Sequence, residues 1–346
     1  MAHDGVATVG EEAWVTLERR VLTVTELADV ARAAVGAAHR LVDVTRLEGG
    51  TKKGVYRLVF DDGFTAVAYV WDDNENYWPS VGSDGAQDLS DPFSNASALD
   101  LFEASRRHLE ALAIRSPEII LTDRTATHFP GDVAVVEDVT GGTLEALIRS
   151  DLDGAANVMG KLGETLARMR GHKGQHFGKV ALIDEGGVSA GATCEQVVMD
   201  RAIGDLANAA SRDTRVARQR GQLEELAHEL VGFVAPRAQY GLIHGELGPD
   251  HVLLDSQADP VLIDIEGLMF FDIEWEHAFL RLRFGEQYRW LECSGLDDNR
   301  MTFYTFAMHL SLVAGPLRLL DGDYPHRHFL EQIAEHHLHQ LLGFLP

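Results

Sequence analysis

Residues 243–266 read IHGELGPDHVLLDSQADPVLIDIE, and no other part of the chain constrains its architecture as strongly. An apolar strand end runs into a His-Gly-Glu triplet that finishes at Glu246, and a second apolar strand follows His251. After a turn-rich break, a third apolar run delivers Asp264 and Glu266. We expect one hairpin-like unit with carboxylate and imidazole groups at its strand ends, able to supply both a base and ligands for a divalent cation.

The overall composition is that of an ordinary globular protein. Of the 346 residues, 45% are hydrophobic and 24% are charged, and the length allows roughly two domains or lobes. No apolar run approaches the roughly 18–20 residues that cross a bilayer, and the N-terminus lacks the pattern of a secretory signal. The two cysteines, Cys194 and Cys293, have no metal-like spacing. We therefore expect a cytoplasmic protein with no membrane partner, no disulfide scaffold and no zinc site.

The charge balance is strongly acidic, with a formal net charge of -24. Such a chain lacks the basic patches that bind a phosphate backbone, so we expect no nucleic-acid partner. The excess of carboxylates is compatible with a cationic small substrate, and equally with an acidic surface kept for solubility. Lysine is scarce in this chain. The lysines are Lys52, Lys53, Lys161, Lys173 and Lys179.

The first part of the chain has the pattern of a small β-rich lobe. A loop containing Gly49, Gly50 and Gly54 lies between two predicted strands, and an Asp-Asp-Gly turn indicates a hairpin further on. Residues 74–96 are polar and broken by Pro and Gly, which predicts a long loop, and Ser97 is placed to cap the following helix. The predicted elements are a helix at 21–37, strands at 40–48, 55–60 and 65–71, a helix at 97–112, and strands at 117–121 and 133–139.

The remainder of the chain is predicted to be mainly helical. A Thr-Gly-Gly break at 140–142 separates the two patterns and is typical of a link between lobes. We therefore predict an α+β, bilobal architecture with domains at 1–140 and 141–346, and a ligand cleft at the hinge between them. The helices are expected near 143–150, 154–171, 195–209, 214–234, 273–290, 300–320 and 328–343.

The side chains of the 243–266 segment are of the types that phosphoryl transfer requires. Asp264, at a strand end, suits a ligand of Mg²⁺. Glu246 suits a carboxylate that orients an acceptor hydroxyl and takes its proton. His251 can return to the same metal or hold Glu246 in place. Backbone amides of the glycine-containing loop are suited to cover the phosphates of a nucleotide.

The motif HGELGPDHVLLD, followed by LIDIE, resembles the catalytic loop and metal-binding segment of the aminoglycoside phosphotransferase family, which includes choline kinases and has a protein-kinase-like fold. FFDIEWEHAFL resembles the helix start that follows in that family, and VVEDVTGGTL resembles its hinge. The resemblance covers roughly residues 40–290. It implies an ATP- or GTP-dependent enzyme, using Mg²⁺, that phosphorylates a hydroxyl of a small molecule. The acceptors implied are aminoglycoside or macrolide antibiotics, and choline-like or sugar metabolites.

The resemblance also implies roles for single residues. Glu246 would orient the acceptor hydroxyl, next to His244, which in such motifs usually hydrogen-bonds the loop backbone. Asp264 and His251 would hold the metal, and Glu103 would be the ion-pairing glutamate of the small lobe. The residues implied to contact the nucleotide are Gly49, Gly50, Thr51, Lys53 and Gly54 at the phosphates, and Glu137 and Val139, through backbone groups, at the adenine.

Three residues depart from the family pattern. Glu246 replaces an aspartate and is one methylene longer, so the acceptor pocket must be set back or the side chain folded. His251 replaces a metal-binding asparagine, a change that resembles macrolide phosphotransferases and that an imidazole ligand makes compatible with activity. Tyr69 stands about where the third strand normally carries a phosphate-pairing lysine. The candidates to replace that lysine are Lys52, Lys53 and Arg57.

Several positions keep two interpretations. Glu266 fits a second metal ligand or a structural partner. The aromatic residues Trp71, Tyr77 and Trp78 fit either a ligand site or loop packing. The histidines near the C-terminus form no clean ligand pair on one helical face, which favours a solvated helix.

The function class has an alternative as well. Tyr69 at the lysine position, together with Glu246, fits a pseudokinase-like nucleotide-binding or scaffold protein with little or no transferase activity. Asp272 and Glu276 are expected to cap the next helix and brace the catalytic loop rather than contact substrate. ATP and GTP are not distinguished, because recognition at such a hinge is largely through backbone groups.

Overall fold

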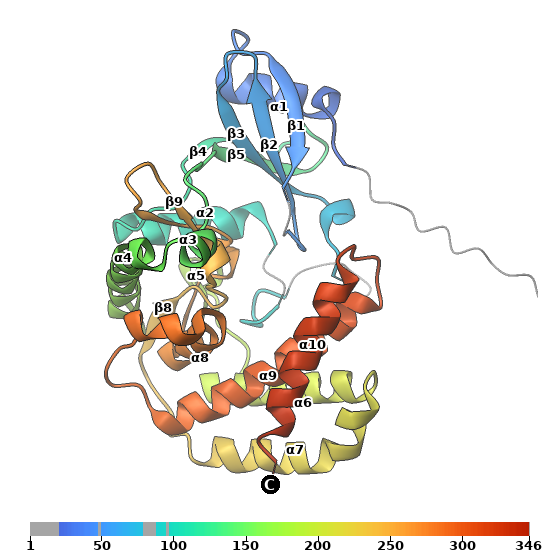
Figure 1. Ribbon diagram of the computed structural model, residues 1–346, viewed down its shortest axis with the longest axis vertical. Coiled ribbons are helices and arrows are strands. Elements are labelled where there is room, and N and C mark those ends of the chain that lie inside the picture. The colour runs from blue at the N-terminus through green and yellow to red at the C-terminus, as the bar shows by residue number, and fades with distance from the viewer. Residues whose placement is uncertain (1–20, 48–49, 79–87, 95–96, 346) are drawn as a thin grey trace, which may run out of the picture.

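The computed structural model describes residues 21–47, 50–78, 88–94 and 97–345. Its first lobe is a five-stranded antiparallel sheet in the order β1-β2-β3-β5-β4, with helix α1 against one face (Figure 1). The elements of this region are α1 (Val24–Val35), β1 (Leu41–Arg46), β2 (Gly54–Phe60), β3 (Thr65–Trp71), α2 (Leu99–Ala111), β4 (Ile119–Asp123) and β5 (Asp132–Glu137).

Strand β3 is the central strand that joins the two sides of this sheet. One set of its alternate side chains packs with α1, and the other set, which includes Tyr69 and Trp71, packs toward α2 and the second lobe. The ring of Tyr69 lies edge-on to Phe102 of α2, with 5.5 Å between the ring centres. Since both faces are covered, β3 is apolar almost throughout, and its inner face is continuous with the core of the second lobe.

The second lobe is mainly helical, which confirms the predicted α+β class, while the domain limits at 140 and 141 stay a prediction. Two small sheets interrupt the helices, a four-stranded sheet in the order β6-β8-β11-β7 and the hairpin β9–β10. The helices are α3 (Leu144–Ser150), α4 (Leu152–Gly171), α5 (Val180–Asp184), α6 (Cys194–Ala210), α7 (Thr214–Gly232), α8 (Ile273–Phe284), α9 (Asp298–Leu320) and α10 (Arg327–Leu342). The strands are β6 (Lys173–Gly174), β7 (Gly178–Lys179), β8 (Tyr240–Ile243), β9 (Val252–Leu254), β10 (Pro260–Leu262) and β11 (Met269–Phe271).

Three local predictions are wrong. The expected hairpin-like unit is divided between two sheets, because β8 pairs with β11 and β6 whereas β9 pairs with β10. The helix predicted at 273–290 ends at Phe284, where Gly285 adopts a φ of 52° and leads into a 3-10 turn. Ser97 does not cap α2, because its Oγ donates instead to the carbonyl of Lys52 at 2.6 Å and the next residue takes the cap position.

Helix α9 is the one helix in the described part of the chain that is long and apolar enough to cross a membrane. The expectation that no run approaches this length therefore does not hold for α9. Its apolar window is 67% buried inside the protein, where it packs against α6, α8 and α10 (Figure 1). Core helices commonly have this composition, and α9 occupies the core of the second lobe.

The chain crosses between the lobes just after β5, and this crossing is tightly packed on the β9–β10 hairpin. The amide of Gly141 donates to the carbonyl of Leu254 at 3.1 Å, and the amide of Leu254 donates to Gly142 at 3.0 Å. A Cβ on Gly141 would lie only 2.2 Å from the Leu254 carbonyl oxygen. Position 141 therefore requires glycine.

We expect Gly141→Ala to destabilise the protein by about 1–3 kcal/mol, because the added methyl group must push aside a backbone carbonyl that closes the hinge. The measurement is the midpoint of urea unfolding. Gly160→Ala is the matched control, since a Cβ there meets open space on helix α4. That control should be neutral or stabilising by about 0.5–1 kcal/mol. Equal midpoints for Gly141→Ala and the natural chain would contradict the close approach.

The connection between β3 and α2 contacts both lobes. Near its start, Glu75 accepts a hydrogen bond from the hydroxyl of Tyr56 on β2. Tyr77 and Trp78 then pack against the corner between α9 and α10, where the ring of Tyr77 lies edge-on to Tyr324 at 5.2 Å. The lobes are therefore joined at this corner as well as at the hinge.

Candidate active site

The turn after β8 is held from beneath by buried side chains. His244 is buried, and its Nε2 hydrogen-bonds the carbonyl of Ile263 at 3.0 Å. Gly245 has a φ of 90°, and its amide donates to Oε2 of Glu276 on α8 at 2.8 Å. Burial lowers the pKa of His244 to about 4 and raises the pKa of Glu276 to about 7. Both residues brace the loop backbone, as expected for Glu276, and His244 is neutral at pH 7.

Glu246, His251 and Asp264 meet at the cleft end of this turn. Nδ1 of His251 lies 2.8 Å from the Glu246 carbonyl, so this nitrogen carries the proton and Nε2 presents its lone pair. Nε2 lies 3.9 Å from Oδ2 of Asp264. The Glu246 side chain is 61% exposed, and the positive charge of Lys52 lowers the pKa of its carboxyl group. The Glu246 carboxylate and the Nε2 side of the His251 ring thus both face the cleft end of the turn.

Asp264 reaches this position through an unusual backbone conformation. It precedes a 3-10 turn (Ile265–Gly267) and has φ 58° and ψ 43°, in the left-handed region. Aspartate tolerates this region better than most residues, and such backbone strain is common where a side chain must be aimed at a ligand. The turn brings both Asp264 and Glu266 to the lining of the cleft, where the Glu266 side chain is buried and that of Asp264 is exposed.

A buried cation links the first lobe to this turn. Lys53, in the loop before β2, donates to Oδ1 of Asp264 at 2.8 Å and to Oε1 of Glu266 at 2.5 Å. Its Nζ lies 5.1 Å from the centre of the Tyr69 ring, so its ammonium occupies the space beside the strand position expected to carry a lysine. Lys53 holds the pKa of Asp264 well below its usual range, whereas burial raises the pKa of Glu266.

The glycine loop at 50–54 is a tight turn that carries Lys53 to Asp264 and Glu266. A Cβ on Gly50 would lie 2.6 Å from the Lys53 carbonyl oxygen, and a Cβ on Gly54 would lie 2.7 Å from the Glu75 carboxyl carbon. Position 50 therefore requires glycine, whereas a side chain at position 54 would have to displace the side chains of Glu75 and Tyr56. Gly49 lies outside the described residues.

Thr51 fastens this loop to the β3–α2 connection. Its carbonyl accepts from the amide of Tyr77 at 2.9 Å, and its hydroxyl accepts from Nε1 of Trp78 at 3.1 Å. Trp78 also lines the cleft, as does Trp71, whereas Tyr77 packs on the second lobe. The aromatic cluster thus combines both roles that the sequence left open.

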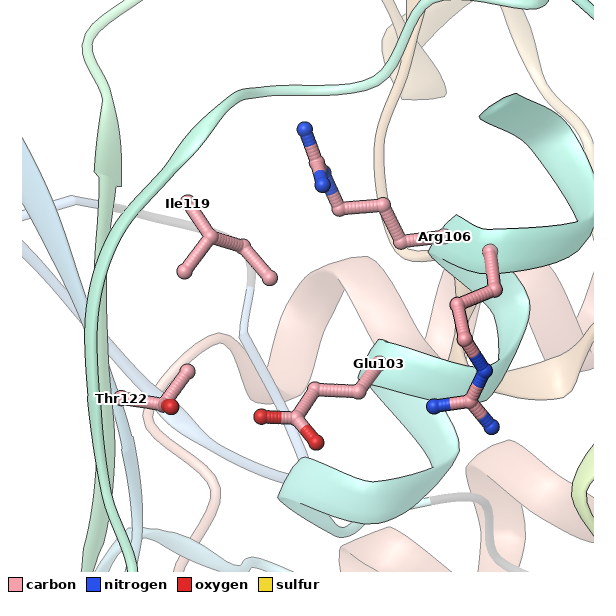
Figure 2. Close-up of a pocket in the computed structure, with 5 residues that line it drawn as sticks. Glu103, Arg106, Ile119 and Thr122 are labelled. Atoms are coloured by element: carbon pink, nitrogen blue, oxygen red, sulfur yellow. The ribbon is translucent and has the colours of Figure 1, made fainter. Parts of the chain in front are cut away.

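Glu103 is not brought to Lys53. It pairs with Arg124 and lines a shallow pocket of about 200 Å³ with Arg106 and neighbouring residues of α2 and β4 (Figure 2). The predicted pairing of Glu103 with a small-lobe cation in the nucleotide site is therefore not seen. Glu266 occupies that role, because it follows Asp264 closely enough to reach the same ammonium.

The hinge residues form ion pairs of their own. The Glu137 carboxylate pairs with Arg115 at 2.7 Å, and the Glu137 amide donates to the carbonyl of Glu118 at 2.8 Å. Arg57 donates two hydrogen bonds to the carboxylate of Asp138, at 2.8 and 3.0 Å. Arg57 is therefore not the replacement for the missing lysine. Val139 is buried. Neither Glu137 nor Val139 lines the large cleft among the described residues.

These groups lie at one end of a cleft of about 1140 Å³ between the lobes. Aromatic residues of the second lobe, Trp275 and Phe279, form part of its wall. The cations among its described lining are Lys52, Arg201 and Arg318. The aspartates that line it besides Asp264 are Asp72, Asp73, Asp88, Asp91, Asp132, Asp200 and Asp205. Carboxylates outnumber cations, which produces a negative potential in the cleft.

One wall of the cleft was not foreseen from the sequence. Residues 88–94 dock on the second lobe through Lys179, whose buried Nζ donates to the carbonyls of Asp91 and Ser94 at 3.0 and 2.9 Å. Between these anchors, Phe93 packs among aromatic rings of the second lobe. Burial lowers the pKa of Lys179 to about 8. A single lysine between Gly178 and Val180 carries no sequence signal for such an anchor.

The site fits a divalent cation carried by a nucleotide. In the described part of the chain no cluster of three or more His, Cys, Asp or Glu residues is arranged to hold a metal by itself. A nucleotide-bound Mg²⁺ needs only one or two protein ligands, because phosphate oxygens and water supply the others. Nε2 of His251 and Oδ2 of Asp264 lie 3.9 Å apart, so these two side chains would be the ones to hold such a cation.

The fold is similar to that of several solved phosphotransferases. A thermostable variant of aminoglycoside phosphotransferase APH(4)-Ia, solved with AMP-PNP and hygromycin B, matches with 17% identity and a TM-score of 0.60 over 92% of this chain and 99% of that one. APH(2")-IIia, solved with GDP and kanamycin, matches with 15% identity and a TM-score of 0.56 over 88% and 93%. Choline kinase LicA from Streptococcus pneumoniae matches with 12% identity and a TM-score of 0.58 over 91% and 98%. No curated protein sequence matches.

Two lobes around an acidic cleft, with this turn at one end, give the chain the kinase-like fold of these phosphotransferases. The sequence profile described as "Phosphotransferase enzyme family" matches residues 43–297. The chain belongs to this family, and the predicted resemblance and the predicted enzyme class are confirmed.

Proposed function

We propose that this protein transfers the γ-phosphoryl group of ATP or GTP to a hydroxyl of a cationic small molecule. The observation that carries the proposal is the convergence of Lys53, Asp264 and Glu246 at the base of an acidic cleft. Lys53 brings the glycine loop of the first lobe onto the carboxylate suited to a metal, and Glu246 faces the cleft where an acceptor would lie. These are the parts that position a nucleotide and a hydroxyl for in-line transfer.

Each side chain has a distinct task in this proposal. Glu246, ionised beside Lys52, orients the acceptor hydroxyl and takes its proton as the oxygen attacks phosphorus. His251 donates from Nδ1 to the Glu246 backbone, so the turn that holds Glu246 also fixes the imidazole. Asp264 and His251 would hold Mg²⁺, which when bound neutralises the phosphate charge. The glycine loop at 50–54 would cover the phosphates, and the hinge near Glu137 and Val139 would meet the base.

A cationic acceptor fits the charge of the cleft. The unpaired or solvent-facing aspartates along its walls attract ammonium groups and raise their local concentration. The aromatic side chains Phe93, Trp275 and Phe279 add apolar surface on the same walls. An aminoglycoside or a choline-like metabolite satisfies both features, and a macrolide with an amino sugar satisfies them as well. His251, at the macrolide-type position, keeps this last class among the candidates.

The pseudokinase alternative rested on the absent lysine of the third strand together with Glu246 in place of aspartate. Lys53 supplies an ammonium beside Tyr69, and it is paired with two carboxylates of the turn that would hold the metal. This placement supports an active site rather than a nucleotide-binding scaffold. We further propose that the enzyme works in the cytoplasm, with a small molecule rather than a nucleic acid or membrane as its partner, which is in keeping with its net charge of -24 and its two free cysteines.

The proposal is tested in two stages. Mg·ATP or Mg·GTP should raise the thermal midpoint, because a ligand that binds only the folded protein stabilises it by about 2.7 kcal/mol at 100 times its Kd. Transfer of labelled phosphate should then be measured with hygromycin B, kanamycin, spectinomycin, choline and an amino-sugar macrolide. No shift with either nucleotide would refute the proposal. A shift with no transfer to any cationic acceptor, and transfer to neutral sugars instead, would overturn the cationic acceptor.

A further inference from the structure

The loop before β2 carries two consecutive lysines that serve different carboxylates. Lys53 turns inward to Asp264 and Glu266, and its side chain is only 9% exposed. Lys52 turns to the other side of the loop and into the cleft, where its Nζ lies 3.8 Å from Oε2 of Glu246. The two ammonium groups thus lie at different carboxylates. That of Lys53 is at Asp264, which is suited to the metal, and that of Lys52 is at Glu246, which is suited to the acceptor.

The backbone of Lys52 is held firmly. Its carbonyl accepts from Ser97 Oγ at 2.6 Å, and the preceding Thr51 is bonded to the amide of Tyr77 and the indole of Trp78. The ion pair of the Lys52 ammonium with Glu246 is long, at 3.8 Å, and the Glu246 side chain is 61% exposed, whereas that of Lys52 is 23% exposed. A long pair with one solvent-exposed partner contributes little stability, so a better partner can replace it.

The electrostatic field of Lys52 reaches both sides of the reaction path. Its charge is the main cause that lowers the pKa of the Glu246 carboxyl group, and it also contributes to lowering the pKa of Asp264. The Lys52 ammonium lies 3.8 Å from Oε2 of Glu246, in the cleft space that the Asp264 side chain also lines. In transfer, the phosphoryl group must pass through that space, with negative charge spread over its three equatorial oxygens.

We infer that Lys52 is a catalytic residue whose ammonium leaves Glu246 and contacts the transferred phosphoryl group. This inference rests on the proposed function. As the acceptor oxygen bonds to phosphorus, the bond from phosphorus to the bridging oxygen breaks, and the electron pair leaves with the nucleoside diphosphate. The acceptor proton passes to Glu246. Lys52 neutralises charge on the phosphoryl oxygens during this step, whereas Lys53 stays fixed between its two carboxylates.

The resting contact has a second consequence. While Lys52 pairs with Glu246, the carboxylate stays ionised, but the ammonium lies next to one of its two oxygens. A phosphoryl group that draws the ammonium away frees Glu246 for the hydroxyl. The base therefore becomes available when the nucleotide is in place.

The test separates binding of the ground state from binding of a transition-state mimic. Lys52→Met, Lys52→Arg and the exposed control Lys173→Met are titrated with ADP or GDP and Mg²⁺, with and without aluminium fluoride, which mimics the planar phosphoryl group. Hydrolysis of ATP and GTP by water is measured in parallel. For Lys52→Met we expect diphosphate affinity within about threefold of the natural chain, but a loss of about 10²–10³-fold in hydrolysis and in fluoride-dependent tightening. Lys52→Arg should retain part of both, and Lys173→Met should retain all.

Fluoride-dependent tightening is a readout that a merely structural residue would not change. Unchanged fluoride-dependent tightening in this variant overturns the inference, even if water hydrolysis is too slow to measure. Failure of the natural chain to bind any nucleotide would instead refute the proposed function. An unfolding midpoint equal to that of Lys173→Met shows that the variant is folded.

Discussion

Asp264→Asn is expected to lose phosphoryl transfer by at least about a thousandfold while keeping the fold. Asparagine accepts the left-handed backbone at position 264 about as well as aspartate, so the change removes charge without forcing the turn. The variant loses the proposed metal ligand and one of the two carboxylates that hold Lys53. Turnover of Mg·ATP and Mg·GTP, to an acceptor or to water, measures the loss.

The control for this variant is Asp153→Asn, an exposed aspartate in the first turn of α4. It makes the same chemical change far from the cleft and should keep full turnover. Adding Mg²⁺ should increase the thermal shift caused by nucleotide in the control but not in Asp264→Asn. Full turnover by Asp264→Asn would remove this residue from the proposed site.

Lys53→Met is expected to cost about 3–5 kcal/mol of stability at pH 7, because it leaves Asp264 and Glu266 close together with no cation between them. Both carboxyl groups then resist ionisation in the folded state, so their folded pKa values rise above their unfolded values. A folded state that binds protons more readily than the unfolded state gains stability as the pH falls. Lowering the pH from 7 to 5 should therefore stabilise this variant more than the natural chain, as urea midpoints would show.

Two double variants separate the effect of losing the Lys53 charge from the effect of where that charge lies. Lys53→Met with Glu266→Gln should recover much of the lost stability, since it removes the second buried carboxylate. Its nucleotide binding should be as weak as that of Lys53→Met alone. Lys53→Met with Tyr69→Lys returns an ammonium from β3 and should recover both properties, because the Tyr69 ring lies directly beside Lys53. A Lys53→Met protein as stable as Lys173→Met at pH 7 would contradict the buried pairing.

Much of this molecule follows from local sequence patterns. The strands of the first lobe, the long helices of the second and the catalytic turn all carry strong periodicity or distinctive residue types, and these elements formed close to where they were expected. The bracing role of Glu276 also followed, but Asp272 does not cap α8 with its side chain and pairs with Arg300 and Tyr304 instead. The family match over residues 43–297 agrees with the motif order read from the chain.

Other features depend on tertiary packing that no local pattern encodes. Three cations were candidates for the missing lysine, and only the fold shows that Arg57 is taken by the hinge while Lys53 reaches Asp264. Glu103 was expected in the nucleotide site from its order in the chain, but its carboxylate pairs with Arg124 and lines a separate small pocket. The division of the expected hairpin between two sheets depends likewise on β11, a three-residue strand too short to recognise.

The docking of Tyr77 and Trp78 on the α9–α10 corner has a consequence for how the protein unfolds. Two lobes joined by a hinge alone would melt as separate units, each with its own transition. Here the first lobe contributes aromatic rings to an apolar cluster of the second, and the inner face of its sheet is continuous with the main core. We therefore expect the two lobes to unfold in a single cooperative transition. A destabilising substitution in either lobe would then lower the free energy of unfolding of the whole protein.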